Sequence, residues 1–172
     1  MKQLFVNPYE KIRSHVDFIF GPRTSSLLSE NLEIEYSKKT GKIKSFSMNE
    51  KLIGTFRSDG GIALTIFGAR LFIRHKPFLQ HCIVPVQDAI PFVSEGRSLF
   101  VKHVSHCGSC VRCGSEVAII DSNQSILAVG RSLFSSSYFA QMANEQSRKS
   151  NGILQIRGIG VKIREGIKSR ST

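Results

Sequence analysis

The chain has 172 residues, of which 41% are hydrophobic and 22% charged, and its formal net charge is +11. A chain this apolar is not kept disordered by its composition, and its length fits one ordinary domain or two small ones. The longest apolar runs, such as residues 117–120, fall far short of the roughly 18 residues of a membrane span. Disordered and transmembrane classes are therefore excluded.

The first half of the chain predicts one helix followed by an antiparallel sheet. Asn7, Pro8 and Glu10 form a helix N-terminal pattern, and apolar residues then recur at helical spacing until Gly21. From Leu32 the apolar period changes to two, with turns between short segments, which is typical of an antiparallel meander. We expect strands at residues 32–36, 43–48, 52–57 and 62–65, a short helix at residues 66–74, and a first α+β domain over residues 1–79.

The second half predicts a small barrel made mostly of strands. Its short apolar segments alternate with turn residues, and two helical segments are short enough to cover the ends of a barrel. We expect this β pseudo-barrel to span residues 80–167, with residues 168–172 forming a flexible basic tail. The expected strands are residues 83–86, 99–104, 116–120, 126–133 and 155–163, and the expected helices are residues 88–94 and 138–143.

The positive charge is spread along the chain. Thirteen basic and 7 acidic side chains precede position 80, whereas 11 basic and 6 acidic side chains follow position 79. This even distribution indicates folded surfaces with positive faces, for which phosphate-rich partners are the natural ligands. A role in solubility alone is the alternative. The first eleven residues hold too few consecutive apolar side chains for a secretory signal, so we expect a cytoplasmic protein without a membrane partner.

Four segments of the second half carry a family resemblance. They read GRSLFVKHV (residues 96–104), GSEV (residues 114–117), LAVGR (residues 127–131) and GVKIR (residues 160–164). In order and spacing they resemble the motifs of a PUA domain. The resemblance implies a small pseudo-barrel that binds structured RNA, often the acceptor region of tRNA.

The first half resembles the domain that precedes PUA in archaeosine tRNA-guanine transglycosylase. The similar segments are VDFIFG (residues 16–21), YSKKTGKI (residues 36–43) and GTFRSDG (residues 54–60). The catalytic barrel of that family does not fit within 172 residues. The resemblance therefore implies an archaeal, non-catalytic RNA-binding protein that takes part in tRNA modification, with a separately encoded catalytic chain as a possible partner.

Within this fold, residue types and alternation predict an RNA-binding face. Gly96 lacks a Cβ, which lets a phosphate or ribose approach the backbone. Lys162 and Arg164 alternate with apolar residues, so one face of that strand packs and the other binds. Such cations neutralise phosphates rather than read bases, and the alternative for each is an ordinary solvated charge. The predicted RNA-binding residues are Gly96, Arg97, Lys102, His103, Gly130, Arg131, Lys162 and Arg164.

A cysteine-rich loop suggests a different chemistry. His106, Cys107, Cys110 and Cys113 could supply three thiolates and an imidazole to zinc. The spacing also begins an iron–sulfur motif, but Val117 occupies the position of the fourth cysteine. In a reducing compartment we favour free thiols, because a metal loop normally needs a second pair of ligands from elsewhere in the chain. We expect no metal and no cofactor, while a zinc- or redox-active enzyme using this loop remains an alternative.

The sequence offers no other catalytic constellation. The aspartates fall at helix and turn positions without a paired carboxylate, and no glycine-rich phosphate-binding loop occurs. A third alternative is a protein-interaction module whose N-terminal sheet pairs with a partner. We therefore predict a non-catalytic RNA-binding protein. The aspartates that fall at helix and turn positions without a paired carboxylate are Asp17, Asp59, Asp88 and Asp121.

Overall fold

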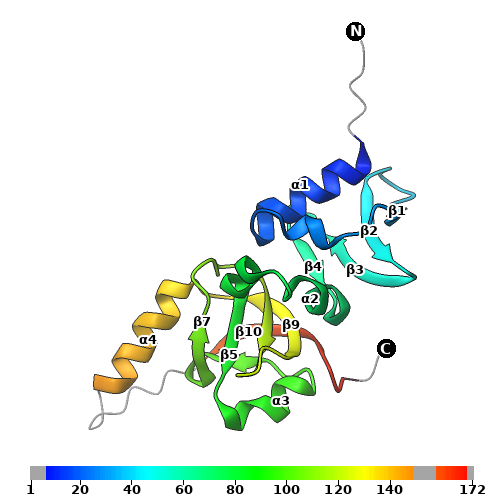
Figure 1. Ribbon diagram of the computed structural model, residues 1–172. Coiled ribbons are helices and arrows are strands. Elements are labelled where there is room, and N and C mark those ends of the chain that lie inside the picture. The colour runs from blue at the N-terminus through cyan, green and yellow to red at the C-terminus, as the bar shows by residue number, and fades with distance from the viewer. Residues whose placement is uncertain (1–6, 149–157, 170–172) are drawn as a thin grey trace. The chain divides into compact units, whose positions relative to one another are not determined.

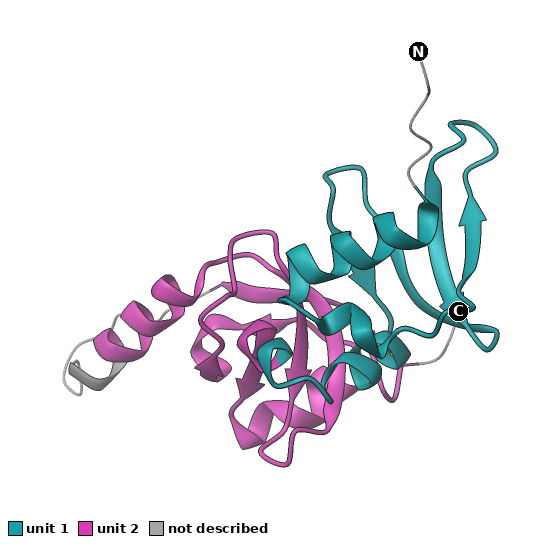
Figure 2. Ribbon diagram, turned by 45° about the horizontal axis from the view of Figure 1, so that its top comes forward, with its two compact units in different colours: residues 1–78 teal, residues 79–172 magenta. Residues whose placement is uncertain are grey.

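The computed structural model describes residues 7–148 and 158–169. The chain divides into two compact units, residues 1–78 and residues 79–172, drawn in teal and magenta in Figure 2. Each unit has its own sheet and its own helices (Figure 1).

Unit 1 begins with helix α1, Pro8–Phe20. The Asn7 side chain accepts a hydrogen bond from the Tyr9 amide at 3.0 Å, as the N-terminal pattern predicts. The helix ends at Gly21, whose φ of 103° is in the region that favours glycine. One face of α1 is buried, so the helix covers the core of unit 1.

The sheet of unit 1 is the predicted antiparallel meander in the order β1-β2-β3-β4. A short 3₁₀ turn links α1 to the sheet, and a short helix capped by the Thr65 side chain follows it. The elements are η1 (Thr24–Leu27), β1 (Glu33–Tyr36), β2 (Ile43–Met48), β3 (Lys51–Phe56), β4 (Ile62–Leu64) and α2 (Ile66–Phe72).

Three phenylalanine rings form the centre of this unit. Phe20 of α1, Phe72 of α2 and Phe78 are fully buried, and their ring centroids lie 5.5 to 5.8 Å apart in tilted or edge-on contacts. Each comes from a different segment, so the cluster ties the two helices to the chain that leaves the unit.

Unit 2 contains a six-stranded mixed sheet in the order β6-β10-β9-β8-β5-β7. All neighbouring strands are antiparallel except β5 and β8, which run parallel. The strands are β5 (Cys82–Pro85), β6 (Leu99–Phe100), β7 (Val104–Cys107), β8 (Glu116–Ile120), β9 (Ile126–Ser132) and β10 (Ile159–Gly166).

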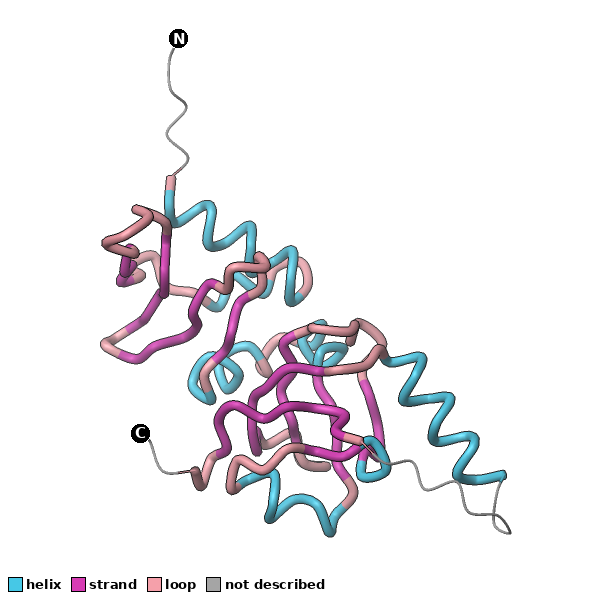
Figure 3. Tube along the Cα trace, turned by 180° about the vertical axis from the view of Figure 1, so that it is seen from behind, coloured by secondary structure: helices cyan, strands magenta, loops and turns pink. Residues whose placement is uncertain are grey.

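The two outermost strands of this sheet are consecutive in the chain. The 3₁₀ turn η4, Val101–His103, carries the chain from β6 at one edge to β7 at the other. The Val86 amide donates to the His103 carbonyl at 2.8 Å and fixes the crossing. The prediction of one strand over residues 99–104 was therefore wrong, because η4 interrupts it and joins the two edges of the sheet. Figures 1 and 3 show the sheet of this unit.

Short helices flank the curled sheet. Helix α3, Ile90–Ser94, follows the 3₁₀ turn η3, Gln87–Ala89, while a further 3₁₀ turn, η2, Lys76–His81, precedes β5. Helix α4, Ser136–Arg148, is longer than the predicted residues 138–143, and its Phe139 packs into the core. The α+β fold class is confirmed: a helix and antiparallel sheet are followed by a curled pseudo-barrel.

The phenylalanine cluster generates a stability prediction with a control on the same helix. We expect Phe20→Ala to lower the free energy of unfolding by about 3–5 kcal/mol, because it leaves a cavity between α1 and α2. Phe18, two residues away, is 88% exposed, so Phe18→Ala should change stability by less than about 0.5 kcal/mol. Urea unfolding followed by circular dichroism measures both, and equal losses would contradict the proposed core.

Candidate nucleic-acid interface

Three of the predicted cations share one face of the β9–β10 strand pair. Lys162 lies directly opposite Arg131 in the ladder, and Arg164 lies two residues further along β10. All three are exposed, whereas Val161 and Ile163, which alternate with them, are buried. The structure thus places these three basic residues together. We call Arg131, Lys162 and Arg164 the strand patch.

A carboxylate that the sequence analysis did not assign to the site lies within this patch. Glu116 of β8 is opposite Arg131, and its side chain is only 1% exposed. Arg164 binds it with both guanidinium nitrogens, Nη1 donating to Oε2 at 3.1 Å and Nη2 donating to Oε1. This bidentate pair fixes Arg164 and neutralises much of its charge.

The other two cations of the patch are held differently. The Arg131 Nε donates to the Gly114 carbonyl at 3.2 Å, which orients the guanidinium along the sheet surface. Among the described residues, no carboxylate forms an ion pair with Lys162. The strand patch therefore presents Lys162 and Arg131 to solvent. Arg164 also links β10 to β8 through Glu116.

Gly130 lies inside the sheet rather than on its surface. A Cβ at this position would stand 2.4 Å from the Lys162 carbonyl oxygen, so the missing side chain allows β10 to approach β9 closely. The role of Gly130 in this geometry is to hold Lys162 and Arg131 side by side.

Gly96 and Arg97 lie at the end of α3, next to the last residues of β10. Gly96 has a φ of 91°, and the position of a Cβ there would be 3.4 Å from Ser169. Ser169 and Lys168 belong to a hydrogen-bonded turn in which the Lys168 amide donates to the Ser94 carbonyl at 2.8 Å. The space beside Gly96 is thus partly filled by the chain that follows β10, and residues 170–172 of the predicted tail lie outside the described residues.

Arg97 combines a cation with an exposed aromatic ring. Its guanidinium lies 5.4 Å from the centre of the Phe92 ring, and its Nε is 3.4 Å from the Glu95 carboxylate. Both partners are exposed, so these contacts orient Arg97 without removing it from solvent.

Lys102 and His103 lie on η4, where the barrel closes. Lys102 is exposed, and the His103 ring meets the exposed Phe100 ring edge-on at 6.4 Å. Strand β10 runs from the neighbourhood of η4 to that of α3, over about 25 Å for its eight residues. The predicted residues therefore form three positions along one strand rather than a single cluster.

The cysteine loop is anchored by its backbone and by Val111. The Cys110 amide donates to the Gln80 carbonyl at 3.0 Å, and the fully buried Val111 packs into the core between two exposed cysteines. The Cys113 thiol donates to the Leu133 carbonyl at 3.2 Å. In the described part of the chain, no three His, Cys, Asp or Glu side chains lie close enough together to bind a metal ion.

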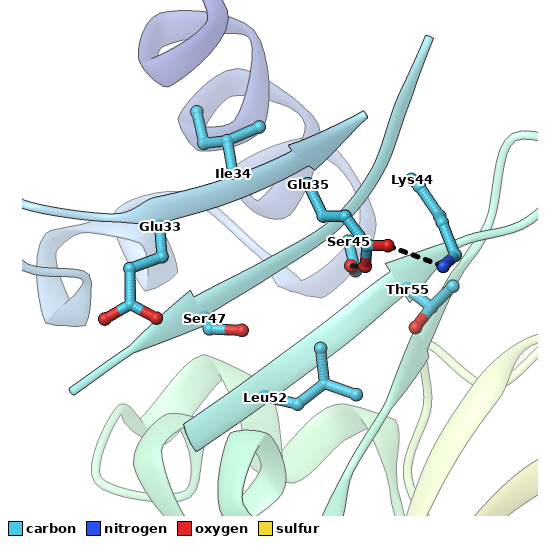
Figure 4. A pocket seen from close by; sticks show the side chains of 8 residues that line it. All are labelled: Glu33, Ile34, Glu35, Lys44, Ser45, Ser47, Leu52 and Thr55. Carbon is cyan, nitrogen blue, oxygen red and sulfur yellow. Dashed lines mark hydrogen bonds and ion pairs between the residues drawn. The ribbon is translucent and has the colours of Figure 1, made fainter. Parts of the chain in front are cut away.

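The outward face of the unit 1 sheet holds an open groove of about 410 Å³ (Figure 4). Its polar groups bind one another, since Glu35 accepts hydrogen bonds from Lys44 and Ser45, both at 2.7 Å. The bonds from Lys44 and Ser45 lower the pKa of Glu35.

Comparison with known families defines the class of protein. Residues 83–154 match the model of the PUA domain. Residues 10–78 match that of the patch-forming domain C2 of tRNA-guanine transglycosylase. The second half of the chain thus matches a PUA domain, and the first half matches a C2 domain ahead of it. This arrangement resembles the C-terminal part of archaeal tRNA-guanine transglycosylase, as the motifs of both halves predict.

Curated relatives and solved structures agree with these matches. The tRNA-guanine(15) transglycosylase of Methanothermobacter thermautotrophicus is 28% identical over 147 residues, which cover 84% of this chain and 22% of that protein. Its counterpart from Thermococcus kodakarensis is 32% identical over 136 residues, or 78% of this chain and 21% of that protein. The chain thus spans about a fifth of the length of these relatives.

Two solved structures share the fold over nearly the whole chain. A hypothetical protein from Pyrococcus horikoshii OT3 has a TM-score of 0.68 at 14% identity, covering 94% of this chain and 91% of that chain. A conserved PUA domain protein from Thermoplasma acidophilum has a TM-score of 0.56 at 16% identity, covering 94% and 90%. At these identities the likeness concerns the fold.

Because Glu116 pairs with Arg164, we expect Arg164 and Lys162 of the strand patch to contribute differently to the stability of the fold. Arg164→Ala removes the bidentate partner of a buried carboxylate, so we expect it to lower the free energy of unfolding by about 2 kcal/mol, between the values for exposed and buried pairs. Lys162→Ala should change it by less than about 0.5 kcal/mol. Denaturant unfolding measures both variants, and a similar loss in the two would refute this distinction.

The cysteines should separate into two reactivity classes. Burial raises the pKa of the Cys82 thiol to about 12 and that of Cys107 to about 11, so both remain protonated at neutral pH. We expect iodoacetamide to modify the exposed Cys110 and Cys113 in the native protein, and all four cysteines only after denaturation. Mass spectrometry of the alkylated protein tests this, and equal labelling of Cys107 and Cys110 would contradict it.

Proposed function

We propose that this chain binds RNA, specifically tRNA in its acceptor region, and that it does so without catalysing a reaction itself. The observation that carries the proposal is the strand patch: Arg131 and Lys162 lie opposite each other on the exposed face of a domain that matches PUA. Two solvent-facing cations in register suit neighbouring phosphates of a nucleic-acid backbone.

The rest of the chain supports a polyanionic ligand. The net charge is +11, Arg97 lies over the exposed Phe92 ring, and the exposed Phe100 ring meets His103 next to Lys102 in the sequence. Rings of this kind stack on unpaired bases, while the cations bind phosphates. The β10 strand, which links these positions, would then lie along the RNA.

A role in tRNA modification follows from the relatives, which are named tRNA-guanine(15) transglycosylases. The described residues hold no paired carboxylates or nucleophile and base that we recognise as an active site, so the chemistry in this proposal belongs to a separately encoded catalytic chain. We also propose that the protein is cytoplasmic. Its four cysteines, none of them in a disulfide, fit a reducing compartment. No helix in the described part of the chain is long and apolar enough to cross a bilayer.

Charge reversal of the strand patch tests the proposal. We expect the unmodified protein to bind tRNA with an affinity that falls steeply between about 50 and 200 mM salt. Arg131→Glu combined with Lys162→Glu should weaken binding at least tenfold and reduce the slope of log affinity against log salt by about 1.5, since two phosphate contacts are lost. Fluorescence anisotropy with labelled tRNA gives both values.

The matched control reverses two exposed lysines of unit 1, Lys11 and Lys51, and changes the net charge equally. Losses of the same size in the control and in the strand-patch variant would show a general charge effect and sink the proposed site. A protein without measurable tRNA affinity at 50 mM salt would overturn the function itself. Protection of the acceptor stem from nuclease, lost in the strand-patch variant, tests the region of tRNA.

A further inference from the structure

The turn between β1 and β2 in unit 1 holds a second cluster of basic residues, separate from the strand patch of unit 2. Residues 37–42 read SKKTGK, and Lys38, Lys39 and Lys42 are all exposed. We call residues 37–42 the lysine hairpin. Three ammonium groups within five residues form a compact charge at the end of a two-stranded projection.

The backbone of the lysine hairpin is held in one conformation. The Ser37 amide donates to the Lys42 carbonyl and the Gly41 amide donates to the Ser37 carbonyl, both at 2.8 Å. The Thr40 amide also donates to the Ser37 hydroxyl at 3.3 Å, and Gly41 has a φ of 65°, which favours glycine. The lysines therefore project from a fixed turn, so binding a ligand does not require the turn to be ordered first.

Ion pairs distinguish the hairpin lysines from the next lysine along β2. Lys44 donates to the Glu35 carboxylate at 2.7 Å, so its charge is already compensated. Among the described residues, no carboxylate forms an ion pair with Lys38, Lys39 or Lys42. Glu35 interacts electrostatically with Lys44 and, more weakly, with Lys38, so it lies at the boundary of the hairpin charge.

The opposite end of the same strands carries two carboxylates, Glu33 and Glu50, next to Lys51. Glu33 begins β1, and its carboxylate accepts a hydrogen bond from the Glu50 amide in the β2–β3 turn at 3.1 Å. Figure 4 shows Glu33 at one end of the groove and the Glu35–Lys44 pair at the other. A polyanion is therefore attracted more strongly to the lysine hairpin than to the other end of the groove.

We propose that the lysine hairpin binds the phosphate backbone of RNA and gives unit 1 its own contact, in addition to the strand patch of unit 2. The inference rests on the proposed RNA-binding function. Residues 37–42 carry lysines, hydroxyls and glycine and no apolar side chain, and the exposed ring of Tyr36 comes directly before them. Lysine ammonium groups on long stems suit phosphates without selecting a sequence.

The test compares two triple neutralisations in the full chain, with labelled tRNA as the probe. One variant carries Lys38→Gln, Lys39→Gln and Lys42→Gln. The control carries Lys11→Gln, Lys51→Gln and Lys76→Gln, three exposed lysines on separate elements of the same unit, so both variants lose the same charge. Circular dichroism checks that both remain folded.

We expect the hairpin variant to bind tRNA at least tenfold more weakly at 50 mM salt and to show a log–log salt slope smaller by about 2 to 3, at roughly 0.7–0.9 for each lost contact. The control should change affinity less than threefold. A hairpin variant that matches the control overturns the inference. If the strand-patch variant is weakened in the same assay, the proposed function survives that result, whereas an unmodified protein that does not bind tRNA removes both.

Discussion

The curling of the unit 2 sheet is the constraint on which the candidate interface depends. Strands β6 and β7 lie at opposite edges of the sheet, yet only the three residues of η4 separate them in the chain. A flat six-stranded sheet could not satisfy so short a connection, because neighbouring strands are about 4.8 Å apart. Closure fills the inner face with apolar side chains and leaves the cations of β9 and β10 on the outer one.

In both units, a carboxylate decides which cations remain available to a ligand. Glu116 binds Arg164 in unit 2, and Glu35 binds Lys44 in unit 1. Each pair lies beside lysines that have no such partner in the described part of the chain. The pairing positions one basic side chain within the sheet surface, whereas Lys162 and the lysines of residues 37–42 form no ion pair in the described part of the chain. A count of basic residues alone therefore overstates the charge that either surface presents.

Close backbone approach supports the same arrangement. Without a side chain at Gly130, β9 and β10 can pack at the point where Arg131 and Lys162 stand opposite each other. The sequence predicts Gly130 as a residue that contacts the ligand. In the structure, Gly130 instead sets the distance between the two strands that carry Arg131 and Lys162.

The sequence by itself determined the features that depend on neighbouring residues. The Asn7 cap, the alternation of Lys162 and Arg164 with Val161 and Ile163, and the α+β fold class follow from local patterns and family motifs. Only the tertiary structure separated β6 from β7, and only it brought Glu116 to Arg164 across 48 positions of the chain. Local patterns define which side chains face outward, but the partner of each charge depends on strand order and register. Strand order and register are set by contacts between segments that are far apart in the sequence. Local sequence patterns do not contain that information.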